Sequence, residues 1–411
     1  MAVTVALPFR VPLAIGGETV NLLLPLYFVI AAGGAARAVQ ALRRSGAEPW
    51  RRPGALEWLL LGFVVLYALQ AGYSADASQA VQHVAFFYVP FALLFVQLSG
   101  VRWSAQLLAI CLGVLVALAL LFCAVAFVEE ATRSVLLNDK LRASNAYNPY
   151  FRANSLFFDP NIFGRYLVVV MLLVAPVAGW ASSARRAAAA AAVLTIAWVG
   201  LLTTLSQSSF GSLLGGLAVL VMARGVGRRI AVPAAAVIIA GLVLLLAFPG
   251  SLRLNLDSAG SVRKATSGRS DLVSGGTALF ADRPVLGWGS GAFGVEYRRR
   301  ELDRRGGADV TASHTIPLTI AVEQGLAGLA VYIALLAVCF RLLLRGARAS
   351  LPRAAIASAF AALVLHSLGY AAFLEDPMTW AILAVGAALA RCAGQRSSRA
   401  TSVSPTSRNS L

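Results

Sequence analysis

The segment ASHTIPLTIAVEQGLAGLAVYIALLAVCF, residues 312–340, combines a titratable ring, a carboxylate and two glycines with a long apolar run. His314 stands at the start of this run, Glu323 lies nine residues later, and Gly325 and Gly328 follow. An imidazole titrates near neutral pH, so His314 has the chemistry of a general base. A carboxylate more than two turns into an apolar helix is expensive unless it is paired or functional. The alternatives are that His314 caps a helix at the water–lipid boundary and that Glu323 braces the helix bundle.

Arginines near two other apolar runs are suited to an anionic ligand, because a guanidinium binds phosphate bidentately. Arg152 lies shortly before the turn at 159–161, and Arg165 lies one turn inside the apolar run that follows. The Asp-Pro-Asn sequence of this turn predicts a helix N-cap. Arg263 and Arg269 lie in the polar stretch that precedes a glycine-containing loop. The alternatives are interfacial anchoring for the first pair and simple solvation for the second.

The composition indicates that these residues belong to a membrane protein. Of the 411 residues, 59% are hydrophobic and 13% are charged, and the mean hydropathy is +0.75. Lipid accepts that much apolar surface, whereas a soluble domain cannot bury it. We predict an all-α, polytopic transmembrane helix bundle of about 11–12 spans, forming a single integral membrane domain over residues 1–411. The predicted spans lie at roughly 18–37, 56–73, 79–99, 104–128, 161–181, 187–205, 210–224, 230–249, 315–340, 354–373 and 377–391, with residues 1–17 as a re-entrant or interfacial piece.

The arginines predict the orientation of the bundle, because short arginine-rich connections stay in the cytoplasm. Such connections carry Arg37 and Arg43, Arg185 and Arg186, and Arg341 and Arg345. Two long connections, residues 129–160 and 250–314, are therefore expected outside, and residues 392–411 are expected to be a disordered cytoplasmic tail. The outer connections are unusually basic, which favours an anionic ligand at the outer face.

Several other patterns are assigned structural roles. The sequence GSGAFG at 289–294 matches a dinucleotide fingerprint, but no strand precedes it and no βαβ unit follows, so we expect a turn against the membrane surface or a ligand. The arginines are scattered between apolar runs, which argues against nucleic acid. The cysteines lack the spacing of metal ligands, and we expect neither a metal nor a cofactor.

Three further expectations concern packing. The stretch SSFGSLLGGLAVL places Gly211 and Gly215, and Ser212 and Gly216, four residues apart, which predicts close helix packing. His83 and His366 lie in or beside apolar runs and are expected to be packing residues. Glu375 and Asp376 form a short charged turn, which is expected to be solvated.

The order of these segments resembles that of the O-antigen ligases and related polysaccharide polymerases of bacterial envelopes, over roughly residues 145–345. The matching positions are His314-Thr315 with Gly325 and Gly328, Arg152 with Asp159-Pro160-Asn161, and Arg269 with Pro284, Gly287 and Gly289. Thr315 departs from the Asn, Ser or Gln that ligases usually show. Ser209 stands where many members carry Arg, which removes one phosphate contact.

The resemblance implies a metal-independent membrane glycosyltransferase, an O-antigen ligase or a polysaccharide repeat-unit polymerase of lipopolysaccharide or exopolysaccharide synthesis. The donor would be a glycan on undecaprenyl diphosphate at the periplasmic face of the bacterial inner membrane. The acceptor would be a glycan, the lipid A core or another hydroxyl compound. His314 would act as the base, with Glu323 orienting it, and Arg152, Arg165, Arg263 and Arg269 would hold the diphosphate. The alternative is a non-enzymatic transporter or flippase of lipid-linked saccharides.

Overall fold

The computed structural model describes residues 1–15, 18–43, 52–147, 150–224, 269–302 and 315–402. These residues are almost entirely helical, which confirms the predicted all-α, polytopic bundle. Among them, seven helices are long and apolar enough to cross a membrane, and two shorter apolar helices follow at Leu351–His366 and Pro377–Cys392. The predicted span 230–249, as well as Arg263 and His314, lies outside the described residues.

The elements follow one another along the chain as helices joined mostly by short connections, with one hairpin near the N-terminus. They are α1 (Ala2–Ala6), β1 (Val11–Ile15), β2 (Glu18–Leu22), α2 (Leu24–Arg43), α3 (Ala55–Gln70), the 3-10 turn η1 (Ala71–Tyr73), α4 (Ala77–His83), the π-helical turn η2 (Val84–Tyr88), α5 (Val89–Ser99), α6 (Ala105–Thr132), α7 (Asp139–Tyr147), α8 (Pro160–Trp180), α9 (Ala184–Thr204), α10 (Gln207–Arg224), α13 (Arg269–Asp282), α14 (Phe293–Leu302), α15 (Ile316–Leu344), the 3-10 turn η3 (Ala347–Ala349), α16 (Leu351–His366) and α17 (Pro377–Ser402).

Three predicted boundaries are wrong. The first span begins at Leu24 rather than at residue 18, because Glu18–Leu22 pairs with Val11–Ile15 in an antiparallel hairpin. The span predicted at 354–373 ends at His366, where a loop over residues 367–376 begins. The tail predicted to be disordered from residue 392 is helical as far as Ser402, and residues 403–411 lie outside the described residues.

α8 is the central helix of the bundle. Of its most apolar window, 67% is buried within the protein, against 11–28% for the other candidate spans. Its N-terminus follows the predicted cap, because the Asp159 carboxylate accepts a hydrogen bond from the Asn161 amide (2.6 Å) and Pro160 occupies the first helical turn. α8 packs against α6, α9, α10 and α16, so its side chains face protein rather than lipid.

The small residues of α10 allow close packing at some positions, which include Gly215, where an added Cβ atom would lie 2.0 Å from Leu365 Cδ1. A Cβ atom on Gly216 would lie 2.4 Å from Leu172 Cδ1 of α8 and 3.1 Å from Ala362 Cβ of α16. A Cβ atom on Gly211 would meet nothing within 4 Å. The predicted role in helix packing therefore holds for Gly215 and Gly216 and not for Gly211.

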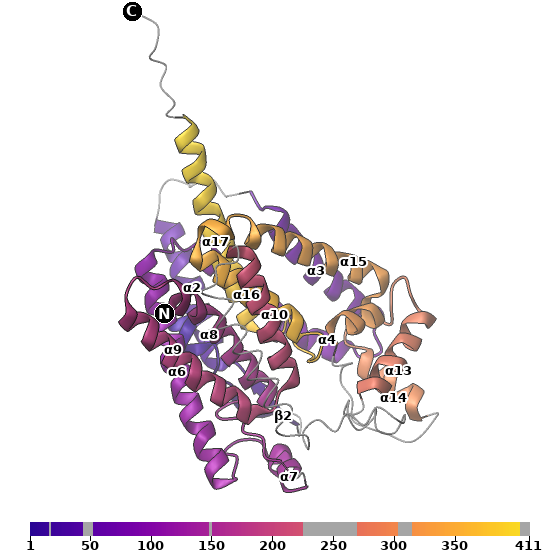
Figure 1. The fold of residues 1–411 in the computed structure, drawn as a ribbon. Coiled ribbons are helices and arrows are strands. Elements are labelled where there is room, and N and C mark those ends of the chain that lie inside the picture. Colours follow the sequence, from indigo (N-terminus) through magenta and orange to yellow (C-terminus); the bar gives the residue numbers. More distant parts are fainter. Residues whose placement is uncertain (16–17, 44–51, 148–149, 225–268, 303–314, 403–411) are drawn as a thin grey trace, which may run out of the picture.

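The connections predicted to lie outside contain short helices of their own. Figure 1 shows α7, β2, α13 and α14 away from the C-terminal end of α17, which extends from the opposite side of the bundle. α13 and α14 pack beside the first half of α15, around a small apolar cluster that includes Phe293, Tyr297 and Val322. This placement brings the loop between α13 and α14 against α15.

We predict that Gly216→Val destabilises the protein by about 1–3 kcal/mol, the usual cost of forcing extra methyl groups into a packed core. The matched substitution Gly211→Val introduces the same residue into the same helix, where the added atoms meet open space. Thermal unfolding of the two purified variants in detergent measures the difference. Equal melting temperatures for both would show that α10 does not pack closely through Gly216.

Candidate active site

α15 is interrupted in its first half at Gly325, where the backbone has φ +64° and ψ −162°. The interruption removes helical hydrogen bonds, and the loop over residues 284–289 replaces them. Trp288 and Gly289 donate their amides to the carbonyls of Val322 (2.9 Å) and Glu323 (2.8 Å). In the opposite direction, the amides of Leu326 and Ala327 donate to the carbonyls of Pro284 (2.7 Å) and Val285 (3.3 Å), and Gln70 Nε2 of α3 donates to the carbonyl of Gln324 (3.3 Å).

The glycines of the two sequence motifs are the residues that make this contact possible. A Cβ atom on Gly325 would lie 2.3 Å from the Val285 carbonyl oxygen, and one on Gly287 would lie 2.4 Å from the Glu323 carbonyl oxygen. Both glycines have positive φ, a conformation that other residues rarely adopt. Gly328 leaves room for the Gln324 side chain, whose Cβ lies 2.1 Å from the position of an added Cβ. The loop therefore turns tightly against α15 at Gly287. The turn against the membrane surface or a ligand that was expected for GSGAFG stays a prediction; within the protein, a Cβ atom on Gly289 would lie 2.5 Å from Ser74 Cα.

Glu323 is buried at this break, and its carboxylate faces the start of α14. Glu323 Oε1 accepts a hydrogen bond from the amide of Phe293, the first residue of α14 (3.3 Å). A carboxylate is favourable at a helix N-terminus, where amides are unpaired and the helix dipole is positive. This contact supports the interpretation that Glu323 braces the structure. The orienting role toward His314 stays a prediction, because His314 lies outside the described residues.

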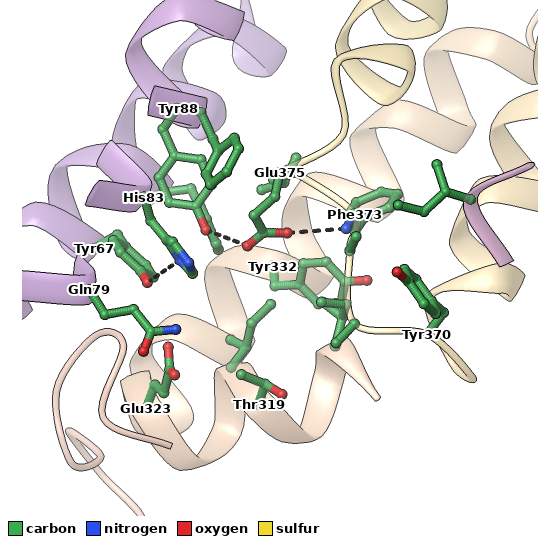
Figure 2. A pocket seen from close by; sticks show the side chains of 18 of the residues that line it. Tyr67, Gln79, His83, Tyr88, Thr319, Glu323, Tyr332, Tyr370, Phe373 and Glu375 are labelled. Carbon is green, nitrogen blue, oxygen red and sulfur yellow. Dashed lines mark hydrogen bonds between the residues drawn. The ribbon is translucent and has the colours of Figure 1, made fainter. Parts of the chain in front are cut away.

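Glu323 also lines a cavity of about 270 Å³ at the beginning of α15. Figure 2 shows Glu323 on the side of the cavity formed by Gln79, Tyr67 and His83, whereas Glu375 lies between Tyr88 and Phe373. The remaining lining residues are mostly apolar or aromatic, and they include Arg10, Ile162, Ile316, Thr319, Tyr332 and Tyr370. Ile316 is the first residue of α15 and stands two positions after His314 in the sequence. The chain thus enters the cavity wall directly after the predicted base.

The polar side chains of the cavity are held by hydrogen bonds from different helices. Tyr67 of α3 and His83 of α4 bond through the phenol oxygen and the imidazole Nδ1 (2.9 Å). Tyr88 donates its hydroxyl to Glu375 Oε1 (2.9 Å), and the Phe373 amide donates to Glu375 Oε2 (3.2 Å). A cavity of this kind, with aromatic walls and a few convergent polar groups, is typical of a ligand site.

The loop over residues 367–376 forms one wall of the cavity, and its charged turn is not solvated as predicted. Asp376 is buried and forms an ion pair with the buried Arg165 of α8 (Asp376 Oδ2 to Arg165 Nη2, 2.9 Å). Arg165 Nη1 also donates to the Ala372 carbonyl (2.8 Å), so α8 holds this loop at two points. The start of α15 is tied to the same loop, because the Ile316 amide donates to the Ser367 carbonyl (3.0 Å).

Tyr370 of this loop connects it to the N-terminal cap of α8. Its hydroxyl donates to Asp159 Oδ2 (3.0 Å), so one carboxylate serves both the cap and the loop. Burial and the neighbouring Asp159 carboxylate raise the pKa of Tyr370. The phenol is therefore neutral at neutral pH and acts as a donor to Asp159.

Arg152 lies in a separate polar network beside the same end of α8. Its Nε donates to the Thr204 carbonyl (2.9 Å) and its Nη2 to Asn161 Oδ1 (3.3 Å). The network continues from Asn161 through Ser206 and Ser209 to His366 Nε2, with oxygen–oxygen and oxygen–nitrogen distances of 2.8–3.1 Å. His366 is fully buried and hydrogen-bonded, in line with its predicted packing role. Ser209 also lies beside Gly164, so a small residue suits this position.

The structure thus brings only part of the predicted site together. Glu323 lines the cavity, whereas Arg165 stands behind its wall and Arg152 connects to it through Asn161, the neighbour of Ile162. Arg269 is the first residue of α13, and its side chain lies outside what the structure describes. The roles of these residues in binding a diphosphate stay predictions.

Sequence reasoning missed several residues of the cavity, namely Arg10, Tyr67, His83, Tyr88 and Glu375. They belong to four separate segments, and nothing in their spacing shows that they converge. The sequence does contain a signal for His83 and Glu375. Each is an ionisable residue in or beside an apolar run, where such residues are usually functional or paired.

Comparison with known proteins agrees with this architecture of a multi-pass helical membrane protein. Residues 172–333 match the family model described as O-antigen ligase. The matched part runs from the second half of α8 to the middle of α15 and contains Arg269, the loop over residues 284–289 and the motif from His314 to Gly328. The resemblance to the O-antigen ligases is thereby confirmed over these residues. No curated protein matches the chain.

We predict that Gly325→Ala destabilises the protein by at least about 1–2 kcal/mol, the cost of a left-handed conformation for an L-residue, because its Cβ also collides with the Val285 carbonyl. Hydrogen exchange of the Trp288 and Gly289 amides, which bond to α15, is expected to accelerate. Gly113→Ala in α6 is the matched control, since a Cβ there meets nothing within 4 Å. Unchanged exchange and melting in Gly325→Ala would show that the loop docks without this backbone conformation.

Proposed function

We propose that the protein is a membrane glycosyltransferase that moves a glycan from undecaprenyl diphosphate to an acceptor hydroxyl, as an O-antigen ligase or a polysaccharide repeat-unit polymerase. The observation that carries the proposal is the cavity lined by the start of α15, a stretch of chain that lies within the matched family segment and directly follows His314. The site is proposed to face the periplasm from the inner membrane. The acceptor is a glycan, the lipid A core or another hydroxyl compound.

The proposed reaction exchanges one bond at the anomeric carbon of the donor sugar. The acceptor oxygen forms a bond to this carbon, and the bond between the carbon and the diphosphate oxygen breaks. The acceptor proton passes to the imidazole of His314, and undecaprenyl diphosphate leaves with the bonding electron pair. General-base assistance of this kind contributes about 10²–10⁴-fold to a rate.

The leaving diphosphate gains negative charge in the transition state, and cationic groups must stabilise it. Arg152, Arg263 and Arg269 are proposed to supply that charge in place of a divalent ion, so the reaction is proposed to be independent of metal. Arg165 is proposed to act through the loop over residues 367–376, since its guanidinium is paired with Asp376 (2.9 Å). Glu323 is proposed to keep the start of α14 and the break in α15 in place beside His314.

The proposal is tested with the purified chain in proteoliposomes in which the lipid-linked glycan is presented from one side only. A glycosyltransferase consumes the donor and releases undecaprenyl diphosphate when an acceptor is supplied. Movement of intact donor across the bilayer, with no consumption under any acceptor condition, would favour the transporter alternative.

We predict that His314→Ala lowers turnover by about 10²–10⁴-fold while donor binding and the melting temperature stay close to wild type. The reason is that the imidazole accepts the proton, whereas other residues hold the diphosphate. His314→Gln keeps hydrogen bonding but cannot transfer a proton near neutral pH, and it is expected to be equally impaired. Near wild-type turnover in His314→Gln would reduce His314 to a positioning residue.

We predict that Arg152→Lys and Arg269→Lys each lower kcat/KM by about 10–100-fold, because lysine keeps the charge but loses the bidentate contact. Arg142→Lys is the matched control in the same predicted outer region, since Arg142 pairs with the exposed Asp139 (2.8 Å). Melting temperatures separate lost catalysis from lost packing at Arg152, which also bonds to Thr204. Full activity in both variants, with normal donor affinity, would make these arginines interfacial anchors only.

A further inference from the structure

Arg10 is a cationic residue that lines the cavity, and in the sequence it stands far from the family motifs. It stands in the connection between α1 and β1, outside the matched segment at 172–333, and its side chain lines the cavity at the start of α15. The N-terminal segment therefore contributes to the site, although the sequence suggests only a re-entrant or interfacial piece there.

The charge of Arg10 is incompletely compensated by its surroundings. The charged groups that act on it electrostatically are Asp376 and Arg165, which already pair with each other (2.9 Å). Burial lowers the pKa of the Arg10 guanidinium, and Arg165 lowers it further, while Asp376 and Tyr370 act in the opposite direction. Within the part of the chain that the structure describes, the guanidinium has no hydrogen bond and no ion pair within 4 Å. A partly buried cation in this condition is suited to an anionic ligand.

The carboxylates of the cavity differ from Arg10 because both already have donors. Glu375 accepts from the Tyr88 hydroxyl and the Phe373 amide, and Glu323 accepts from the Phe293 amide. Tyr370 and Tyr27 are among the groups that act on the pKa of Arg10. Among the residues that line the cavity, the cation Arg10 lies on the Tyr370 side and the carboxylates Glu375 and Glu323 lie toward Tyr88 and His83. The carboxylates behind the Tyr370 side, Asp159 and Asp376, are held by Tyr370 and Arg165. A ligand with an oxyanion at one end and hydroxyl groups at the other fits this polarity.

We propose that Arg10 binds an oxyanion of the ligand in this cavity, either a phosphate of the lipid-linked donor or the carboxylate of an acidic sugar. The planar guanidinium donates two parallel hydrogen bonds to either group. The hydroxyl groups of the attached sugar would face Glu375, Tyr332 and His83. The identity of the ligand rests on the proposed function, whereas the presence of an anion site beside Arg10 does not.

The experiment measures thermal unfolding of the purified full chain in detergent against increasing inorganic pyrophosphate and, separately, glucuronate, at constant ionic strength. Ligands that bind the folded state raise the melting temperature according to their affinity. Wild type is compared with Arg10→Gln, Arg10→Lys and the control Arg37→Gln. Arg37 bonds only to the carbonyls of Val96 and Gln97 among the described residues, far from the cavity lining.

The expected result is that one of the two anions stabilises wild type and Arg37→Gln, and that its apparent affinity falls about 10–100-fold in Arg10→Gln. The apparent affinity of Arg10→Lys is expected to lie between those of wild type and Arg10→Gln. If Arg10→Gln does not fold, the comparison of wild type with Arg10→Lys tests the proposal. Protection by pyrophosphate identifies a phosphate site, and protection by glucuronate alone identifies an acidic sugar. No protection of wild type, or equal protection of wild type and both Arg10 variants, overturns the proposal.

A transfer assay on the same variants separates this inference from the proposed function. Lost pyrophosphate binding in Arg10→Gln without detectable transfer by wild type would leave the anion site standing and contradict the function. Normal transfer by both Arg10 variants, with unchanged KM for the donor and unchanged anion binding, would leave the function standing and contradict the site.

Discussion

A backbone amide or carbonyl without a partner costs several kcal/mol in the apolar interior of a bilayer, so a membrane helix breaks only where other groups replace its hydrogen bonds. α15 breaks at Gly325, and the loop over residues 284–289 supplies the replacement in both directions, with Gln70 of α3 completing it. The loop and the helix lie some tens of residues apart in sequence, so this local interruption requires a long-range contact. The two glycine motifs are therefore two sides of one interface, and neither is expected to form without the other.

The cavity adjoins this interface, because Glu323, which precedes the break by two residues, is one of its lining residues. Docking of the loop delivers the start of α14 to the Glu323 carboxylate, which completes one wall. The opposite wall is the loop over residues 367–376, which Arg165 holds from the centre of the bundle and which also receives the Ile316 amide. The chain directly after His314 is thus fixed between two walls that are anchored to different helices. Precise placement of reacting groups depends on such rigid support.

The spans and the cap at Asp159 could be predicted because hydropathy and N-capping are local properties of the sequence. The sequence also marks Gly325 and Gly287 as members of motifs, but their positive φ depends on a partner segment that only the fold supplies. The burial of Asp376 could not be predicted, since a charged turn between apolar runs is solvated unless a partner such as Arg165 arrives from another helix. The convergence of His83, Glu375 and Arg10 on one cavity could not be predicted either. These residues lie on separate elements, so their positions in the sequence do not indicate that they are close in space. The matched family segment covers the loop and the motif at α15, whereas most of the cavity wall lies outside it.

The arginines of this region differ in whether a carboxylate already neutralises their charge, and this difference decides whether they can bind an anionic ligand. Diverting Arg165 to a ligand would leave Asp376 as an uncompensated buried carboxylate, which costs several kcal/mol. Arg152 donates to the Thr204 carbonyl and to the Asn161 amide oxygen, in the polar network beside α8. Arg10 lines the cavity and, among the described residues, forms no such ion pair. We infer that the buried ion pair maintains the shape of the site, while Arg10 supplies attraction for an anionic ligand. Such a division allows a ligand to bind and leave without breaking the salt bridge that holds the cavity wall.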